Sequence, residues 1–155
     1  MNQAFILQGM KLATPQACSG LYPFCAMTAK LRILVVDDVP DAAESMARML
    51  ASMGHEAAYV TRASQALGVA RETRPHLVFL DLGMPEIDGY ALARLLRAEF
   101  GFDGLRLVAI SGWGRDEDRA ASRQAGFDAH VKKPAEIEII DSILKTVLSG
   151  PILRP

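Results

Sequence analysis

The sequence predicts an α/β fold built around a parallel β-sheet, on three observations. Short apolar runs alternate with segments whose apolar residues recur at helical spacing, which is typical of βαβ units. The first run, Leu31 to Val36, is almost wholly apolar, as expected for a central strand that is covered on both faces. Four of the runs are followed at once by carboxylate, hydroxyl or ammonium side chains, so one edge of the sheet is expected to collect them.

Glycine and proline mark the ends of the expected elements. Gly54 and Gly101 follow two helical segments, Pro75 follows a third, and Gly150-Pro151 closes the last. The expected strands are residues 31–36, 57–60, 77–80, 105–110 and 129–131. The expected helices run from Pro40 to the stop at Gly54, over 64–73, up to about Phe100, over 115–125, and up to the stop at Gly150.

The last two helices differ in how firmly they are expected to dock. Residues 115–125 contain alanines but no large apolar side chain, so this helix can bury little surface and is expected to be the part that moves. The last helix repeats Ile140, Ile143, Leu144 and Val147 on one stripe, which predicts firm packing against the sheet.

The composition indicates one ordinary globular domain. The chain has 155 residues, 50% of them hydrophobic and 23% charged, which is enough apolar material for a two-layered or three-layered core in one compact domain. A formal net charge of −1, with both signs mixed along the chain, gives no basic face, so direct binding to nucleic acid is not expected. No apolar stretch approaches the roughly 20 residues that span a bilayer, so we expect no membrane insertion and a cytoplasmic location.

The expected domain covers residues 31–149 and leaves a short tail over 150–155. Residues 1–30 are interrupted by glycine and proline, and we expect a disordered extension or a start-site artefact there. Cys18 and Cys25 have no further cysteine or histidine at metal-ligand spacing and are expected to be reduced thiols.

The polar residues at the strand ends form one candidate site. They are the acidic pair Asp37-Asp38, then Asp81, Ser111 and Lys133. Three carboxylates in a partly desolvated cleft repel one another, and a divalent cation resolves that repulsion. Mg²⁺ fits best, because it takes one or two carboxylates, keeps several waters and often shares a phosphate oxygen. Asp81 is then left as a nucleophile that forms an acyl phosphate, with Ser111 and Lys133 contacting the phosphoryl group.

Each of these residues also has an ordinary structural explanation. Asp37 and Asp38 can cap the helix that begins near Pro40, and Asp81 can form a turn. A serine or a lysine-proline pair at a strand end carries little information alone. The functional interpretation is favoured because all four positions occur in order, each at the carboxyl end of a predicted strand.

These motifs resemble those of the receiver domain of response regulators, and the resemblance covers residues 31–149. The matching positions are Asp37-Asp38, Asp81-Leu82-Gly83-Met84-Pro85 followed by Asp88-Gly89, Ser111, and Lys133-Pro134. The resemblance implies a doubly wound, flavodoxin-like fold in which five parallel strands, in the order 2-1-3-4-5, are flanked by five helices.

The resemblance also implies roles for single residues. Asp81 would be the phosphoacceptor and a Mg²⁺ ligand. Asp38 and the Gly83 backbone carbonyl would bind the ion directly, and Asp37 mainly through water. The bond between Lys133 and Pro134 would be cis, which aims the lysine inward.

Three positions near the site are expected to modulate it. Many receivers carry an aromatic residue three positions before the lysine, where this chain has His130. A switch there is expected to be weak, pH-sensitive or absent, and an ordinary strand histidine is the alternative. Gly112 leaves space for a bulky phosphodonor. Trp113 is expected to shield the acyl phosphate or, alternatively, to pack over the neighbouring loop.

Three other basic side chains are placed outside the site. Lys132 competes with Lys133, but neighbouring strand side chains point to opposite faces, and the resemblance favours Lys133. His55 and His76 lie beside predicted strand starts and are interpreted as surface residues.

The resulting prediction is a receiver of a two-component or phosphorelay system. It would take a phosphoryl group onto Asp81 from a histidine kinase or a histidine phosphotransfer protein. Similarity to receivers of hybrid histidine kinases leaves a shuttle or kinase-modulating role open. A downstream protein is expected on the face formed by helix 115–125, the strand with His130 and the last helix, with the receiver a monomer or a phosphorylation-dependent dimer.

Two other classes fit the sequence less well. An aspartyl-phosphate phosphatase, such as a haloacid-dehalogenase enzyme, usually needs an acid/base carboxylate two residues after the nucleophile, and here that residue is Gly83. A flavin or nucleotide binder needs a phosphate-cradling loop after the first strand, where Asp37-Asp38 place negative charge. The chain is therefore predicted to be a self-phosphorylating and autodephosphorylating receiver rather than a metabolic enzyme.

Overall fold

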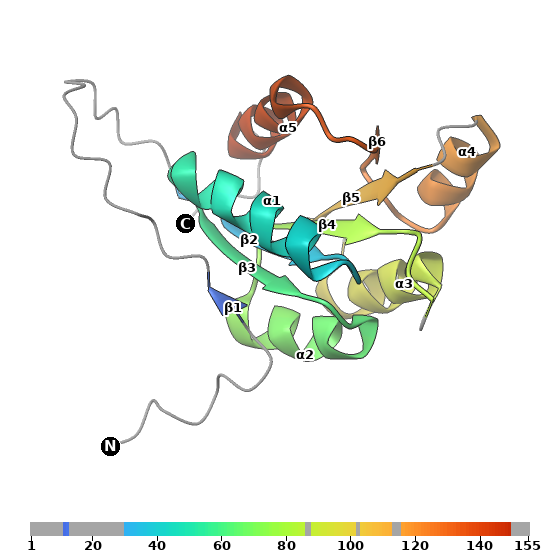
Figure 1. Cartoon of the computed structure of the whole chain (residues 1–155). Coiled ribbons are helices and arrows are strands. Elements are labelled where there is room, and N and C mark those ends of the chain that lie inside the picture. Colours follow the sequence, from blue (N-terminus) through green and yellow to red (C-terminus); the bar gives the residue numbers. More distant parts are fainter. Residues whose placement is uncertain (1–10, 13–29, 86–87, 102, 113–115, 150–155) are drawn as a thin grey trace, which may run out of the picture.

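The computed structural model describes residues 11–12, 30–85, 88–101, 103–112 and 116–149. These residues form one sheet with helices on both faces (Figure 1). The strands are β1 (Lys11–Leu12), β2 (Arg32–Val36), β3 (Glu56–Val60), β4 (Leu77–Asp81), β5 (Arg106–Ser111) and β6 (Ala129–Lys132). The helices are α1 (Pro40–Ser52), α2 (Ala63–Thr73), α3 (Gly89–Phe100), α4 (Asp116–Gln124) and α5 (Ile137–Ser149).

Five strands run parallel, in the order β3-β2-β4-β5-β6. Numbered along the chain among themselves, they have the order 2-1-3-4-5, which confirms the predicted doubly wound fold. The direction of winding changes between β2 and β4, so ligands are expected beyond the carboxyl ends of these two strands. Asp37 follows β2 and Asp81 ends β4, and the topology therefore brings both carboxylates to the switch point.

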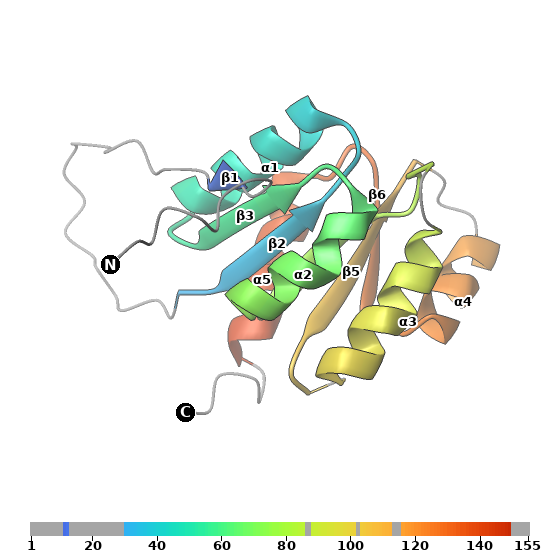
Figure 2. The ribbon, with the colours of Figure 1, turned by 90° about the horizontal axis from the view of Figure 1, so that it is seen from below.

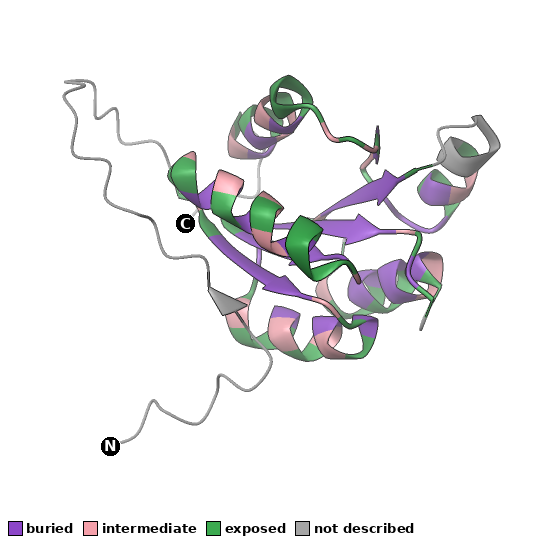
Figure 3. Ribbon diagram, viewed as in Figure 1, coloured by how far each residue is buried: buried purple, intermediate pink, exposed green. Residues whose placement is uncertain are grey.

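Alternate strand residues contribute to two separate hydrophobic cores. On one face α2 and α3 cover residues such as Leu80 and Leu107, and on the other α1 and α5 cover Phe79 and Val108. Figure 2 shows α2 and α3 on the near side of the sheet and α1 and α5 behind it. The buried residues run through the strands (Figure 3), and burial on both faces explains why the first apolar run has no alternation.

The helices α4 and α5 dock differently, in the way the sequence predicts. α5 buries Ile140, Leu144 and Val147 on its inner stripe. In α4 the small side chain of Ser122 is buried, and the buried Ala125 and Phe127 come just after the helix. Among the residues of α4 whose side chains are described, 120–124, the buried contact therefore lies toward the C-terminal end of the helix.

The sheet has one strand that the sequence does not predict. β1 pairs antiparallel with β3, with Lys11 opposite Tyr59 and Leu12 opposite Ala58. A two-residue pairing has no period that a sequence pattern can reveal. The rest of the extension before Lys30, with both cysteines, lies outside the described residues, as does the tail 150–155. Within the described part of the chain, no helix has the length and apolar character needed to cross a bilayer.

Candidate functional site

Three carboxylates gather at the carboxyl edge of β2 and β4. Asp37, Asp38 and Asp81 each place one oxygen within 4.8 Å of the other two. Asp37 and Asp81 are buried, with exposed fractions of 7% and 6%, and Asp38 is more accessible to solvent. The sheet topology thus concentrates negative charge at the point where the sequence predicts a cation site.

Backbone amides fix the orientation of the two buried carboxylates. The Val39 N–H donates to Asp37 Oδ1 and the Gly83 N–H donates to Asp81 Oδ1, each at 2.9 Å. Both are bonds from the amide two residues on, the usual local pairing of aspartate in turns. α1 begins after Val39 without a side-chain cap, and Pro40 occupies its first turn. The carboxylates of Asp37 and Asp38 are therefore not used to cap this helix.

Lys133 bridges the two buried carboxylates from the end of β6. Its Nζ donates to Asp37 Oδ2 at 2.9 Å and to Asp81 Oδ2 at 2.8 Å. Its backbone N–H donates to the Ser111 carbonyl at 2.8 Å, which ties the β6 end to β5. The Lys133–Pro134 bond is cis, as the resemblance implies. Lys132 is exposed, so the structure places Lys133 and not Lys132 among the acidic residues.

The surroundings of Lys133 act on its pKa in two directions. Partial burial opposes the charged form and by itself lowers the pKa. Hydrogen bonds to Asp81 and Asp37, with the attraction of both carboxylates, outweigh burial and raise the pKa of Lys133 above its usual value. The ammonium therefore stays charged throughout the neutral pH range.

The donor set fits a hard divalent cation. Three carboxylates and one ammonium leave a formal charge of −2 in the cluster. Carboxylate oxygens are the protein ligands that Mg²⁺ prefers, and the accessible Asp38 leaves room for the waters that the ion keeps. Asp37, Asp38 and Asp81 are the side chains that would hold such an ion.

Ser111 ends β5 beside this cluster and is 4% exposed. Its Oγ lies 2.7 Å from Nε2 of His130, and Nδ1 of the same ring lies 2.8 Å from Oγ of Ser122. His130 thus lies between the candidate site and α4. The sequence singles out His130 but misses Ser122, because a serine in a polar helix gives no sign of the side chain it faces.

Two glycines border the site. A Cβ at Gly112 would meet no atom of the described residues within 4 Å, whereas a Cβ at Gly83 would lie in contact with Asp81 Oδ1, at 3.4 Å. The open space at Gly112 agrees with the expected approach of a phosphodonor. Trp113 lies outside the described residues, so its expected shielding role stays a prediction.

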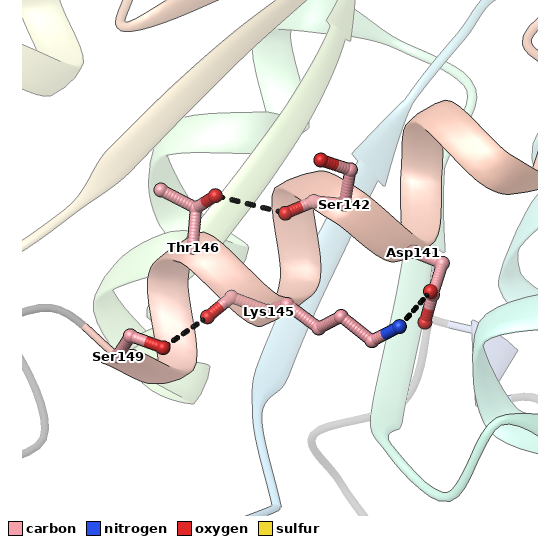
Figure 4. Close-up of a pocket in the computed structure, with 5 residues that line it drawn as sticks. All are labelled: Asp141, Ser142, Lys145, Thr146 and Ser149. Carbon is pink, nitrogen blue, oxygen red and sulfur yellow. Dashed lines mark hydrogen bonds and ion pairs between the residues drawn. The ribbon is translucent and has the colours of Figure 1, made fainter.

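A hollow of about 330 Å³ opens next to Asp38 and continues the site toward solvent. Its other walls are Thr61, Arg62, Ala63, Met84 and Pro85. A separate shallow hollow of about 620 Å³ lies along α5 (Figure 4). There Lys145 pairs with Asp141, and the Thr146 and Ser149 hydroxyls donate to carbonyls of the same helix. None of the residues that line this second hollow belongs to the acidic cluster, whereas the first is lined by Asp38, so the first hollow is the approach to the cluster.

Three comparisons relate the chain to known proteins. The sequence profile of the response regulator receiver domain matches residues 33–145. The DNA-binding response regulator MtrA of Mycolicibacterium smegmatis is 38% identical over 107 residues, which are 69% of this chain and 46% of MtrA. An uncharacterized 14.6 kDa protein in the sodA1 3' region of Leptolyngbya boryana is 32% identical over 124 residues, which are 79% of this chain and 95% of that protein.

Comparison with solved structures also finds a receiver domain as a relative of this chain. The signal receiver domain of a signal transduction histidine kinase from Syntrophus aciditrophicus is 30% identical and superimposes with a TM-score of 0.70, covering 81% of this chain and 95% of that chain. The chain belongs to the response regulator receiver domain family. Receiver domains are signalling modules of two-component systems rather than metabolic enzymes, and they bind Mg²⁺ at an acidic pocket. The match spans about half the length of MtrA, and DNA binding is named for that protein.

Proposed function

We propose that this receiver accepts a phosphoryl group on Asp81, with Mg²⁺ held by Asp37, Asp38, Asp81 and the Gly83 carbonyl. The observation that carries the proposal is the position of Asp81, which is buried beside two further carboxylates and bonded to Lys133. A carboxylate in this position lies beside the candidate cation site at the carboxyl edge of the sheet. The donor would be the phosphohistidine of a histidine kinase or of a phosphotransfer protein.

In the proposed reaction an Asp81 carboxylate oxygen attacks the phosphorus of phosphohistidine. The new O–P bond forms as the N–P bond breaks, and the electron pair of that bond stays on the departing imidazole. A bound Mg²⁺ supplies charge neutralisation for the phosphoryl oxygens. Hydrolysis of the resulting acyl phosphate by water returns the free carboxylate, which is the expected autodephosphorylation.

The other residues position and neutralise the phosphoryl group. Lys133 already bonds Asp81 Oδ2 and would turn its ammonium toward a phosphoryl oxygen. Ser111 would donate its hydroxyl proton to a second oxygen. The open space at Gly112 and the hollow beside Asp38 would admit the donor. Catalysis then depends on placement and electrostatics rather than on an added acid or base.

The output would be a change on the face formed by α4, β6 and α5, which a downstream protein reads. Phosphorylation adds about two negative charges at Asp81, and Ser111 links that site to the strand next to α4. We propose a cytoplasmic protein that does not bind nucleic acid itself and that acts as a monomer or a phosphorylation-dependent dimer.

A second role has its own support. The 30% identity to the receiver domain of a histidine kinase favours a receiver that passes the phosphoryl group onward or modulates a kinase. Transfer assays with purified phosphotransfer proteins separate the roles, because a shuttle returns the group to histidine whereas an output receiver loses it mainly to water.

The proposal is tested by intact-protein mass after incubation with acetyl phosphate and Mg²⁺. The expected result is one labile phosphoryl addition that disappears when a chelator removes the metal. Asp81→Asn should abolish the addition, and Asp41→Asn, at an exposed position in α1, should leave it unchanged. A folded native chain that binds Mg²⁺ but gains no mass from any phosphodonor would overturn the proposal.

A further inference from the structure

We propose that His130 is a positioning residue that connects Ser111 to Ser122 of α4, so that phosphorylation reaches α4 as a change in the imidazole tautomer. The inference rests on the proposed phosphorylation of Asp81 and adds a specific route for the signal. It differs from a switch that works by rotation of an aromatic side chain, because the link consists of two hydrogen bonds to opposite ring nitrogens.

The relay joins three elements through two short contacts. Ser111 Oγ lies 2.7 Å from His130 Nε2, and Ser122 Oγ lies 2.8 Å from His130 Nδ1. Ser111 and Ser122 are 4% and 1% exposed, and the His130 ring is half-buried between them. Both contacts are short enough for strong hydrogen bonds, and burial shields them from competition with water.

The ring can satisfy both contacts only in a coupled way. A neutral imidazole has one N–H donor and one acceptor nitrogen. If Ser111 donates its proton to Nε2, the hydrogen must be on Nδ1, and the ring donates to the Ser122 oxygen. If the hydrogen is on Nε2, the ring donates to the Ser111 oxygen, and Nδ1 accepts from the Ser122 hydroxyl. The direction of one bond therefore sets the direction of the other.

In the proposed resting state Ser111 donates to Nε2 and the ring carries its hydrogen on Nδ1. An acyl phosphate at Asp81 then favours the other arrangement. Ser111 has one hydroxyl proton, and a charged phosphoryl oxygen is a stronger acceptor than an imidazole nitrogen. Once Ser111 donates to that oxygen, its contact with the ring requires hydrogen on Nε2. The ring loses a proton from Nδ1 to water and gains one from water at Nε2, so His130 stays neutral. Ser122 must then reverse and donate to Nδ1.

The change in the hydrogen bond of Ser122 occurs in a helix that has few apolar side chains to pack against the rest of the domain. Ser122 lies in the last turn of a helix that docks through few apolar side chains. His130 and Ser122 also border a surface hollow of about 290 Å³, formed with Arg123, Phe127, Asp128 and Ala129. A change in the hydroxyl orientation and position of Ser122 is thus passed to a surface that a partner can contact.

Nitrogen NMR of the histidine rings tests the proposal without a mutation. The probe is Mg²⁺ with beryllofluoride, a stable stand-in for the aspartyl phosphate, at a pH well above the ordinary histidine value of about 6.5. We expect the His130 signals to shift from Nδ1–H toward Nε2–H. His55 and His76 are internal controls, because their Nδ1 atoms accept from backbone amides at the opposite edge of the sheet, and they should not change.

A variant tests whether the signal reaches α4 through Ser122. Beryllofluoride should change the hydrogen exchange of α4 amides in the native chain, and Ser122→Ala should lose this change while acetyl phosphate still phosphorylates Asp81. Ser142→Ala, at an exposed position on α5, should respond as the native chain does.

The outcomes separate the two proposals. If the native chain is phosphorylated and His130 keeps its resting tautomer, or Ser122→Ala responds like the native chain, the relay is wrong and the proposed function stands. If no phosphodonor adds mass to Asp81, the proposed function fails and the relay fails with it.

Discussion

The two edges of the parallel sheet use polar side chains in opposite ways. At the carboxyl edge Asp37, Asp81 and Lys133 bond one another across strands and retain a net negative charge. At the amino edge several polar side chains bond the backbone as well as one another. The difference separates a reactive edge, which keeps charge available for a ligand, from a structural edge, where polar groups hold loops and strand starts.

Arg97 connects several segments at the amino edge. It reaches from α3 to the carbonyls of Gly126, Gly101 and Leu105, with the first two at 2.7 and 2.9 Å, and it pairs with Asp128. The residue is only 8% exposed. It therefore fastens the segment after α4 to the segment before β5, which anchors the C-terminal end of α4.

The two histidines at this edge hold the start of the central strand. His55 Nδ1 accepts from the Leu31 N–H at 3.4 Å, and His76 Nδ1 accepts from the Arg32 N–H at 3.0 Å. Both side chains are partly exposed, so they lie at the surface as the sequence predicts, but each also holds a backbone amide, a contact that the sequence does not predict. Their backbone partners are 24 and 44 residues away in sequence, which no local pattern reveals.

The largest expected effect comes from breaking the structural edge at Arg97. Arg97→Met should lower the free energy of unfolding by about 3–5 kcal/mol, because the carbonyls of Gly126 and Leu105 lose their charged donor inside the protein and Asp128 keeps only one of its two arginine partners, Arg106. Urea unfolding measures the loss. Arg94→Met is the matched control, since this arginine lies on the same helix with its side chain 62% exposed, and its effect should stay within about 0.5 kcal/mol. Equal losses in the two variants would contradict the assigned role.

A mutation at the reactive edge should change the rate of phosphorylation more than the stability of the fold. Lys133→Met should slow phosphorylation by acetyl phosphate by about 100-fold, the typical cost of losing one preorganised group that stabilises developing charge. The rate of mass gain at saturating Mg²⁺ measures the effect. Lys132→Met removes an exposed neighbouring ammonium and should change the rate little. A Lys133→Met protein that labels at the native rate would show that the ammonium does not act on the phosphoryl group.

Binding of Mg²⁺ at the reactive edge should make the folded protein more stable. Mg²⁺ at about ten times its Kd should raise the free energy of unfolding by about 1.4 kcal/mol, because it binds the folded site and relieves repulsion among three carboxylates. Asp38→Asn should lose most of this gain, and Asp41→Asn should keep it. Thermal unfolding with and without a chelator gives the comparison. An equal gain in Asp38→Asn would place the ion elsewhere.

The sequence predicts the reactive edge better than the structural one, for a physical reason. Asp37, Asp81, Ser111 and Lys133 each end an apolar run, so a local pattern and the rule for ligand sites in parallel sheets are enough to bring them together. Arg97 lies in an amphipathic helix and looks like any exposed arginine. Its burial depends on carbonyls supplied by loops as many as 29 residues away.

Ser122 and β1 are two further features that a local sequence pattern does not predict. Ser122 gains its partner only because β6 places His130 opposite α4, and β1 forms by backbone pairing alone in the part of the extension that is described. Elements with a strong period are predicted to within about a residue of their ends, whereas contacts between elements require the packed structure.

The smallest expected effect is a pH dependence of the structural edge. Burial lowers the pKa of His55, and burial together with the nearby charge of Arg32 lowers the pKa of His76. Below the ordinary histidine value of about 6.5, the unfolded chain therefore binds more protons than the folded chain does. This contribution to stability is fully present above about pH 6.5 and is lost as the pH falls through the lowered pKa values.

The double variant His55→Asn/His76→Asn isolates this contribution. The amide oxygen of asparagine lies close to the position of Nδ1 and can accept the same backbone N–H, but it does not titrate. Urea midpoints measured between about pH 8 and pH 5.5 should fall less steeply in the double variant than in the native chain. If the two slopes are equal, the acid sensitivity comes from other groups, and the two histidines serve as hydrogen-bond acceptors without coupling the structural edge to pH.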